Sequence, residues 1–396
     1  KMHEGELVGI SVVKPETLTG VFTINGSGDL DFPHLTSIGR AAFYGVAMTG
    51  RAVLGDAVTT YVDEGGIPDG LFESSKFAEI VIGDGLATLG TSYPFAYCSR
   101  MTNLVLGAQI TVLVDRFARG CTALKSVTAK ENVRWIRAQM FNGCSKLTSL
   151  DVSSFNTANV TSMNWMFSNT YQLTTITGIE KFNVSKVTDF KFMFNGAGAK
   201  SLDLHTDLEH GYWDVSTRTN LAEIFYWASN LEHLDLTGWD TSSATTMAGL
   251  FYQAKKLTSL DLSHFNTAKV TNMEYMFQYA SHLTSLDFSS FDTKNVTNFG
   301  YFLEYIDKYP KEDKTPVVMY QAAAVLEASG EDDKAFRLRE RLVKGFPDNG
   351  LVPKAWLRIA EYHFMNRKFR DAIGAYKKVT GFENLTGKEA ALAMYH

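Results

Sequence analysis

The most regularly spaced residues that could do chemistry are five aspartates in the middle of the chain. Each comes directly after the second leucine of a short apolar motif, or after the leucine that takes its place. The five residues are Asp151, Asp203, Asp235, Asp261 and Asp287. Neighbouring side chains on a β-strand point to opposite faces, so these carboxylates should leave the core and line one surface. Such a row could bind calcium or a cationic ligand. Alternatively, it hydrogen-bonds to nearby serines, threonines and backbone N–H groups. Either way the surface is acidic and suits basic partners.

A second group of possible metal ligands lies in a short insertion, residues 205–210. Four of its six side chains can coordinate zinc or calcium, namely His205, Asp207, Glu209 and His210. Loops are commonly polar, so we expect a solvated loop here and treat the metal site as the weaker alternative. An insertion that interrupts a regular pattern is also a place for specific recognition.

The three cysteines, Cys98, Cys121 and Cys144, follow one another at intervals of 23 residues. Equal spacing places them in one slot of a repeat, where we expect a buried column of thiols that pack as small hydrophobic side chains. A column does not converge on a point, as a zinc site requires. A disulfide between neighbours would leave one thiol over, so structural thiols are the favoured interpretation.

Aromatic residues outside the expected core positions are candidates for direct contact with a ligand. Four of them join the aspartates as predicted ligand-face residues: Trp165, Trp227, Tyr252 and Tyr275. Tyr226 and Tyr301 occupy comparable positions. Exposed aromatic side chains favour contacts with proteins or carbohydrates. The alternative is that half of them tuck between repeats.

Some classes of function are not expected from this sequence. It contains no G-x-S-x-G, H-E-x-x-H or phosphate-binding glycine motif, so we predict that the protein is not an enzyme. The formal net charge of −5 does not favour a nucleic-acid partner. No apolar run reaches the ~18 residues that a membrane span needs, and the chain opens without a signal-like segment. No cofactor is expected, with calcium as the one alternative.

Internal repeats supply the elements that position these residues. Residues 147–303 repeat with a period of 26, and residues 35–146 repeat with a period of about 23. A fixed period in this range predicts a stacked solenoid whose coils bury a shared core. We expect a parallel β-sheet on one face, two aromatic columns in the core, and a short helical turn on the outer side over 271–277. Residues 47–70, with five glycines, are expected to form a loop or an irregular coil.

The repeats also resemble a known family. The motif LTSLD at 283–287, followed by FDT at 291–293, is similar to the BspA-like leucine-rich repeats of bacterial surface proteins. The shorter repeats with phenylalanine and cysteine look like the second repeat type common in that family. The resemblance covers about residues 35–303. It implies an adhesin-like protein, secreted or at the cell surface, that binds proteins or glycans of a host or neighbouring cell without catalysis.

The pattern changes at about residue 304, where a period of 37 begins. Pro316 and Pro353 occupy equivalent positions and suit the first turn of a helix. The segment 304–396 resembles the tetratricopeptide repeats of bacterial envelope lipoproteins, truncated after two copies. That resemblance implies an alternative function as a periplasmic or envelope scaffold, with a peptide-binding groove. The predicted groove residues are Tyr320, Ala324, Lys354, Leu357 and Glu361.

The predicted fold class is therefore α+β, a leucine-rich-repeat solenoid followed by helical hairpins. The predicted order is an N-terminal cap over 1–34, coils of about 23 residues over 35–146, coils of 26 residues over 147–303, and helical repeats over 304–396. A junction without a linker leaves open that the last segment is fused to the solenoid rather than its natural continuation.

Overall fold

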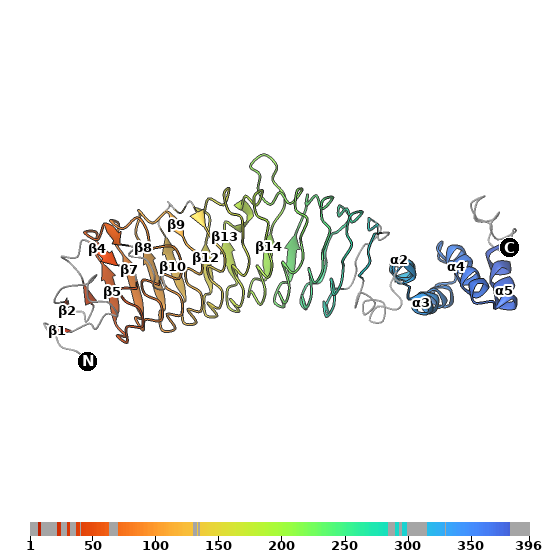
Figure 1. Ribbon diagram of the computed structural model, residues 1–396, viewed down its shortest axis with the longest axis horizontal. Coiled ribbons are helices and arrows are strands. Elements are labelled where there is room, and N and C mark those ends of the chain that lie inside the picture. Colours follow the sequence, from red (N-terminus) through yellow and green to blue (C-terminus); the bar gives the residue numbers. More distant parts are fainter. Residues whose placement is uncertain are drawn as a thin grey trace.

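The computed structural model of the protein describes residues 7–8, 22–24, 30–31, 37–39, 41–62, 70–129, 133, 135–283, 290–292, 295–298, 315–328 and 330–380. Figure 1 shows a long rod of stacked coils, followed by a group of helices near the C-terminal end. Each coil corresponds to one repeat of the sequence, so the repeats stack along the axis of the rod.

One row of strands runs along the rod and forms its main sheet. The first seven pair in the order β1-β2-β3-β5-β7-β8-β10, antiparallel from β1 to β3 and parallel afterwards. They are β1 Leu7–Val8, β2 Phe22–Ile24, β3 Leu30–Asp31, β5 Arg51–Leu54, β7 Glu79–Ile82, β8 Asn103–Leu106 and β10 Ser126–Ala129. The later pairs are parallel because each coil returns the chain in the same direction.

The row continues with two further pairs. They are β12 Ser149–Asp151 with β13 Thr175–Thr177, and β14 Ser201–Asp203 with β15 His233–Asp235. In β12, β13 and β14 the central residue is buried and both neighbours are exposed. This alternation confirms the predicted strand positions and directs the aspartates outward.

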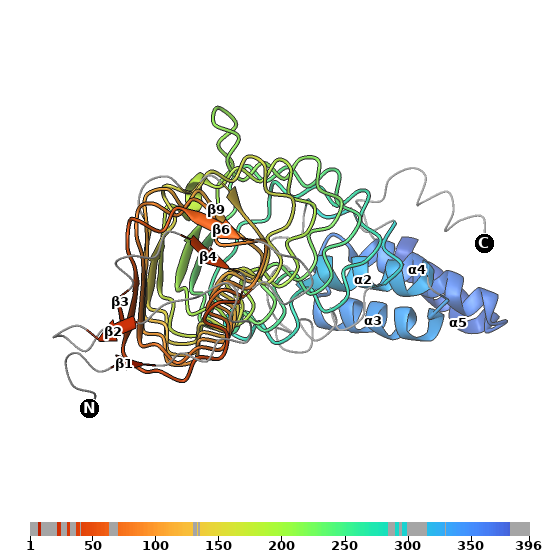
Figure 2. The same cartoon turned by 60° about the vertical axis from the view of Figure 1, so that its left-hand side comes forward.

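A second row of parallel pairs runs along another side of the rod, and the sequence analysis did not predict it. It contains β4 Ser37–Gly39 with β6 Thr60–Val62, and β9 Val112–Leu113 with β11 Trp135–Ile136. Figure 2 shows β4, β6 and β9 across the coil from β3. Because β5 and β6 both lie within the described residues 47–62, this part of the segment 47–70 is a coil rather than a loop.

The predicted helical turn over 271–277 is wrong. Asn272 forms parallel bridges to Thr246 and Asn298, and turns follow it. The backbone N–H and the hydroxyl of Thr271 both donate to Thr245 O, at 2.8 and 3.1 Å. A β-branched residue with both donors committed to the preceding coil favours an extended backbone.

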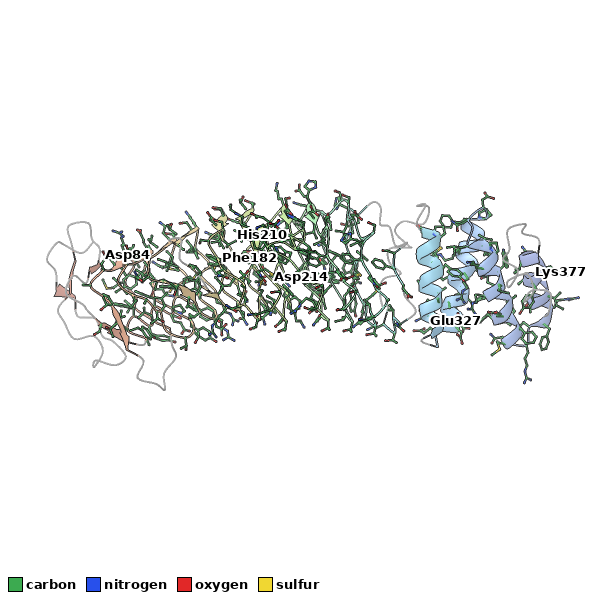
Figure 3. All side chains as sticks on the ribbon, turned by 90° about the horizontal axis from the view of Figure 1, so that it is seen from above. Asp84, Phe182, His210, Asp214, Glu327 and Lys377 are labelled. Carbon is green, nitrogen blue, oxygen red and sulfur yellow. The ribbon has the colours of Figure 1, made fainter. Side chains whose placement is uncertain are left out.

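Stacked aromatic rings fill the interior of the coils, where Figure 3 shows closely packed side chains. In one column the neighbouring ring centroids lie 5.5–5.7 Å apart, and its members are Phe167, Phe194, Phe225, Phe251 and Phe277. The second buried column consists of Phe155, Phe182, Trp213, Trp239, Phe265 and Phe291. The indole N–H groups of Trp213 and Trp239 donate to backbone carbonyls at 2.8 and 2.7 Å, so their burial leaves no donor unpaired. Both predicted aromatic columns are confirmed.

The three cysteines are buried and free, as predicted. Each thiol donates to a backbone carbonyl 26 residues earlier in the chain, at 2.9 Å for Cys98 and Cys121 and 3.1 Å for Cys144. Burial raises the pKa of the Cys144 thiol to about 12 and also raises the pKa of Cys121. A raised pKa leaves little reactive thiolate on Cys121 and Cys144 at neutral pH, and all three side chains are buried, so the column packs as part of the core.

Four helices follow the solenoid. They are α2 Thr315–Ala328, α3 Asp332–Gly345, α4 Val352–Met365 and α5 Phe369–Thr380, and consecutive helices pack against one another. Pro316 and Pro353 lie in the first turns of α2 and α4, as predicted. Gly330 and Arg367 have left-handed backbone in the turns that follow these helices. Among the helices described, none has both the length and the apolar character to cross a membrane.

Candidate ligand-binding surfaces

The aspartates of the β face are exposed, and each one closes the turn that follows its strand. The Oδ1 atom accepts a hydrogen bond from the backbone N–H two residues later, at 2.9 Å for Asp151, 3.3 Å for Asp203, 2.8 Å for Asp235 and 2.9 Å for Asp261. This is an Asx turn, a local arrangement that aspartate and asparagine favour. It matches the interpretation in which the row bonds to backbone N–H groups. Asp287 and Tyr301 lie outside the described residues.

These hydrogen bonds stabilise the charged carboxylates. The side chain and the backbone N–H of the residue two positions later both hydrogen-bond to the carboxylate. These bonds, of which the side-chain bond has the larger effect, lower the pKa of Asp151 and Asp235. Asp203 and Asp235 lie opposite each other in the register of β14 and β15. With Asp261 and His233 they line an open depression of about 350 Å³. Its negative surface suits basic groups of a partner.

Two further corners of the 26-residue coils are closed in a similar way, by aspartate or asparagine in most coils and by the hydroxyl of Ser162 or Thr246 at the last corner of two others. At the second corner the backbone N–H lies 2.9–3.1 Å from the side-chain oxygen of Asn156, Asn183, Asp214, Asp240 and Asn266. At the third corner the equivalent acceptors are Asp189, Asn220 and Asn272. Turn formation therefore accounts for the most regular polar residues of the repeat, and regularity alone does not identify a ligand-binding residue.

The insertion at 205–210 belongs to a β-hairpin that stands out from the coil, in light green in Figures 1 and 2. The backbone N–H and C=O groups of Asp207 and Tyr212 bond to each other at 3.0 and 2.9 Å. Leu208 lies between them in the chain and is 77% exposed. The hairpin thus presents an apolar side chain among polar ones, well clear of the core.

The four metal-ligand candidates of the hairpin divide into separate contacts. His205 Nδ1 lies 2.5 Å from Asp203 Oδ1, and His210 Nδ1 lies 2.8 Å from Asp207 Oδ2. These carboxylate contacts raise the pKa of both histidines. Glu209 contributes its backbone N–H to Asp207 Oδ1. Within the part of the chain that the structure describes, no three histidine, cysteine or acidic side chains converge as a metal site requires.

The predicted outer aromatic residues form one continuous chain of ring contacts. Trp165 lies 4.6 Å from Phe192, which lies 5.2 Å from Tyr226. Tyr226 stacks on Tyr252 at 4.4 Å, and Tyr252 meets Tyr275 edge-on at 6.2 Å. All five rings are half-buried. The rings therefore tuck between coils while part of each reaches solvent. Phe192, which also lies outside both core columns, was not among the predicted residues.

A further group of exposed side chains occupies positions with left-handed backbone. Two residues after the buried phenylalanine of most coils, φ is positive, and Gly143 and Gly196 occupy this position in two coils. Trp227 and Tyr279 occupy it in two others, with φ of 60° and 59°. This conformation costs a residue other than glycine about 1–2 kcal/mol. Trp227 is 49% exposed and Tyr279 is 51% exposed, so burial does not explain their presence.

The predicted groove residues of the helices are spread over α2 and α4. Tyr320 is half-buried on α2, and Lys354 is exposed at the start of α4. Glu361 Oε2 accepts a hydrogen bond from Arg358 Nη1 at 2.8 Å. Glu327 of α2 lies near enough to Arg358 for its charge to favour the protonated guanidinium, so Arg358 faces the neighbouring helix. The sequence analysis missed Arg358 because its role depends on how the helices pack.

An ion pair ties the first two helices together. The Nη1 and Nη2 atoms of Arg339 on α3 donate to the two carboxylate oxygens of Glu327 on α2, at 3.0 and 2.8 Å. The Arg339 side chain is 2% exposed and that of Glu327 is 36% exposed. Figure 3 labels Glu327 within the helical group. The pair is structural, because a buried guanidinium needs a carboxylate partner.

Two family models match parts of the chain. Residues 65–195 match six copies of the BspA type leucine rich repeat region, and residues 202–315 match a family described as Mycoplasma protein of unknown function, DUF285. Neither match extends into α3–α5, so the tetratricopeptide assignment of the helices stays a prediction. No curated protein matches the chain significantly.

Solved structures of bacterial leucine-rich repeat proteins are also similar. A T. pallidum protein is 15% identical, covering 62% of this chain and 91% of its own, with a TM-score of 0.33. A cell surface protein of Faecalibacterium prausnitzii is 14% identical, covering 68% and 94%, with a TM-score of 0.26. A Bacteroides ovatus protein is 13% identical, covering 76% and 99%, with a TM-score of 0.32. The coils described within residues 65–195 agree with the BspA type leucine-rich repeats that match there.

Proposed function

We propose that this protein is a non-enzymatic scaffold that binds proteins or glycans along the surface of its solenoid. The observation that carries the proposal is the continuous core, which runs from coil to coil without interruption. It holds the exposed side chains of successive coils in register on one rigid surface. Solenoid proteins use extended surfaces of this kind for recognition.

The role we assign is adhesin-like, at the cell surface or outside the cell, toward a host or neighbouring cell. The BspA type repeats support this role, because their resemblance is to bacterial surface proteins. The acidic β face at Asp203, Asp235 and Asp261 would contact basic groups of the partner. The hairpin at 205–210 and the outer aromatic rings would supply selectivity. Calcium bound by carboxylates of the β face is a further part of the proposal, whereas a nucleic acid would be repelled.

A second candidate function is an envelope scaffold that binds its partner through α2–α5. Its support is a mixed apolar and charged surface on these helices, where half-buried Tyr320 and Trp356 accompany the exposed Lys354 and Arg358. Paired helices of the tetratricopeptide kind bind extended or helical peptides. In this case the solenoid would act as a spacer.

Retention of ligands by the intact, immobilised chain tests both functions. Extracellular-matrix proteins, matrix glycans and bacterial-envelope proteins would be offered separately, with and without calcium. One variant replaces Asp203, Asp235 and Asp261 by asparagine, which keeps the turn-forming oxygen and removes the charge. A second variant carries Lys354→Glu and Arg358→Glu on α4.

The two variants distinguish the candidates. Retention of a matrix component that weakens only in the aspartate variant supports the adhesin-like role. Dependence of that retention on calcium supports calcium binding on the β face. Retention of an envelope protein that weakens only in the helix variant supports the scaffold role. An intact chain that retains none of these ligands contradicts the proposed function.

A further inference from the structure

An aromatic ridge crosses three successive coils on the outer side of the solenoid. We define the ridge as Trp227, Gln253 and Tyr279, which occupy the same left-handed position with φ of 60°, 56° and 59°. Equivalent positions in other coils hold Gly143 and Gly196, so the fold does not require a side chain there. Tyr97 also presents an exposed ring at this position, but the ridge places two such rings, Trp227 and Tyr279, only two coils apart, where one ligand can contact both.

The two rings of the ridge are held nearly at right angles to the stacked pair beside them. Trp227 meets Tyr226 at 79°, and Tyr279 meets Tyr252 at 72°. Tyr226 and Tyr252 stack on each other at 16°, so they cover each other's faces. The perpendicular rings are half exposed and can offer a face to a ligand. The indole N–H of Trp227 donates to Gln253 Oε1, which holds the ring in this orientation.

The spacing of the ridge fits a periodic polymer. Trp227 and Tyr279 lie two coils apart, which is about 10 Å at the ~4.8 Å spacing of paired strands. Alternate sugar rings of an extended β-1,4-linked glycan are separated by a similar distance. Its sugars have apolar faces that can pack on aromatic rings. Gln253 Nε2 donates one N–H to the Tyr252 hydroxyl at 3.5 Å, and its second N–H can donate to a sugar hydroxyl between the two rings.

The charges near the ridge do not favour a cationic ligand. Lys191 Nζ lies 3.0 Å from Glu223 Oε2, on the coils that lead to the ridge, so these two charges offset each other. Lys255 and Lys256 follow Gln253 within three residues and are exposed. A sugar chain without positive charge therefore suits this surface.

We propose that the ridge binds an uncharged, β-1,4-linked oligosaccharide that runs along the axis of the solenoid. Sugar rings pack on Trp227 and Tyr279, and Gln253 hydrogen-bonds the sugar between them. This inference rests on the proposed binding function, because it names the glycan class and the surface that such binding uses.

Calorimetric titration of the intact chain tests the ridge directly. The probes are cellohexaose, chitohexaose and xylohexaose, with the α-linked maltohexaose as the linkage control and the corresponding β-1,4-linked disaccharides as the length control. We expect at least one β-1,4-linked hexasaccharide to bind, and to bind more tightly than its disaccharide and than maltohexaose. Trp227→Gly and Tyr279→Gly should each weaken binding about tenfold.

Tyr97→Gly is the matched control variant. Tyr97 occupies the same position, with φ of 57° and 42% exposure, in a coil far from the ridge. Its replacement should leave oligosaccharide binding unchanged. Glycine occupies this position in other coils, so all three variants should keep the circular dichroism spectrum of the folded chain.

The proposal is overturned if no β-1,4-linked hexasaccharide binds the unmodified chain, if maltohexaose binds equally well, or if the ridge variants bind as the Tyr97 variant does. Failure of the ridge is distinguishable from failure of the scaffold function. If no β-1,4-linked hexasaccharide binds, but the intact chain and both ridge variants retain the same matrix protein, then the chain is a binding scaffold and only the glycan ridge is refuted.

Discussion

Replacement of Asp235 separates a structural role of the acidic row from a role in calcium binding. Asp235 Oδ1 accepts the N–H of Thr237 at 2.8 Å and so closes the turn after β15. Asp235→Asn keeps an oxygen at this place, whereas Asp235→Ala removes it. We therefore expect the alanine variant to be less stable than the asparagine variant, which should remain close to the unmodified chain.

The expected size of the loss follows from the exposure of the carboxylate. A hydrogen bond to a charged group contributes about 1.5–3 kcal/mol when it is shielded from water. Asp235 is exposed, so water replaces part of the lost bond. Removal of a comparable oxygen from the start of a helix costs about 1 kcal/mol. We expect about 1 kcal/mol for alanine, and less than about 0.5 kcal/mol for asparagine.

Denaturant unfolding followed by circular dichroism, in EDTA and again in calcium, measures this difference. If the turn explanation is correct, the order of stability is the same in both solutions. Equal destabilisation by asparagine and alanine would contradict it, because asparagine retains the turn-forming oxygen. A difference that appears only in calcium would show that the carboxylate acts through the metal.

Three other predictions concern the fold. Acid should destabilise the unmodified chain more than the Asp235→Asn variant, because the pKa of the Asp235 carboxyl is lowered on folding. The stabilising contribution of this carboxylate is complete above its unfolded pKa of about 3.9 and is lost as the pH falls through its folded pKa. Unfolding measured at a series of pH values would show this loss. Glu327→Ala should destabilise the helices by about 2–3 kcal/mol, because Arg339 would keep a buried charge without its carboxylate; hydrogen exchange in α2 and α3 equal to that of the unmodified chain would rule this out. Gly107→Ala should destabilise the solenoid by about 1–3 kcal/mol. The added Cβ would lie 2.0 Å from the backbone oxygen of Gly83 in the preceding coil, and an unchanged unfolding midpoint would refute this close approach.

Features that recur in every coil could be predicted from the sequence. The buried aromatic columns and the cysteine column could be predicted because residues one period apart occupy the same place in the core of successive coils. The turns after α2 and α4 were readable because Gly330 and Asn366 interrupt helical spacing. The Asx turns offered a comparable pattern, since an aspartate or asparagine recurs at most corners, although the sequence alone left calcium as an alternative.

Features that depend on contacts between coils or between helices could not be predicted. The second row of parallel pairs is built from strands of two or three residues and from single bridges, which are too short to give an alternating pattern. The pairing of Arg339 with Glu327 depends on the packing of α3 against α2. The importance of Tyr279 appears only when its backbone angle is compared with those of the glycines in equivalent positions.

Residues that the coil needs for its own turns and core say little about function, whereas residues that the coil does not need can indicate a function. The aspartates of the β face recur because an oxygen at that corner satisfies a backbone N–H, so their regularity follows from the fold. Trp227 and Tyr279 instead stand where the backbone favours glycine, and their rings are half exposed. The fold gains little from those rings, so binding is the more economical explanation of their presence. Consequently, asparagine at Asp235 should alter only charge-dependent binding, and glycine at Trp227 should alter only oligosaccharide binding, while both variants fold.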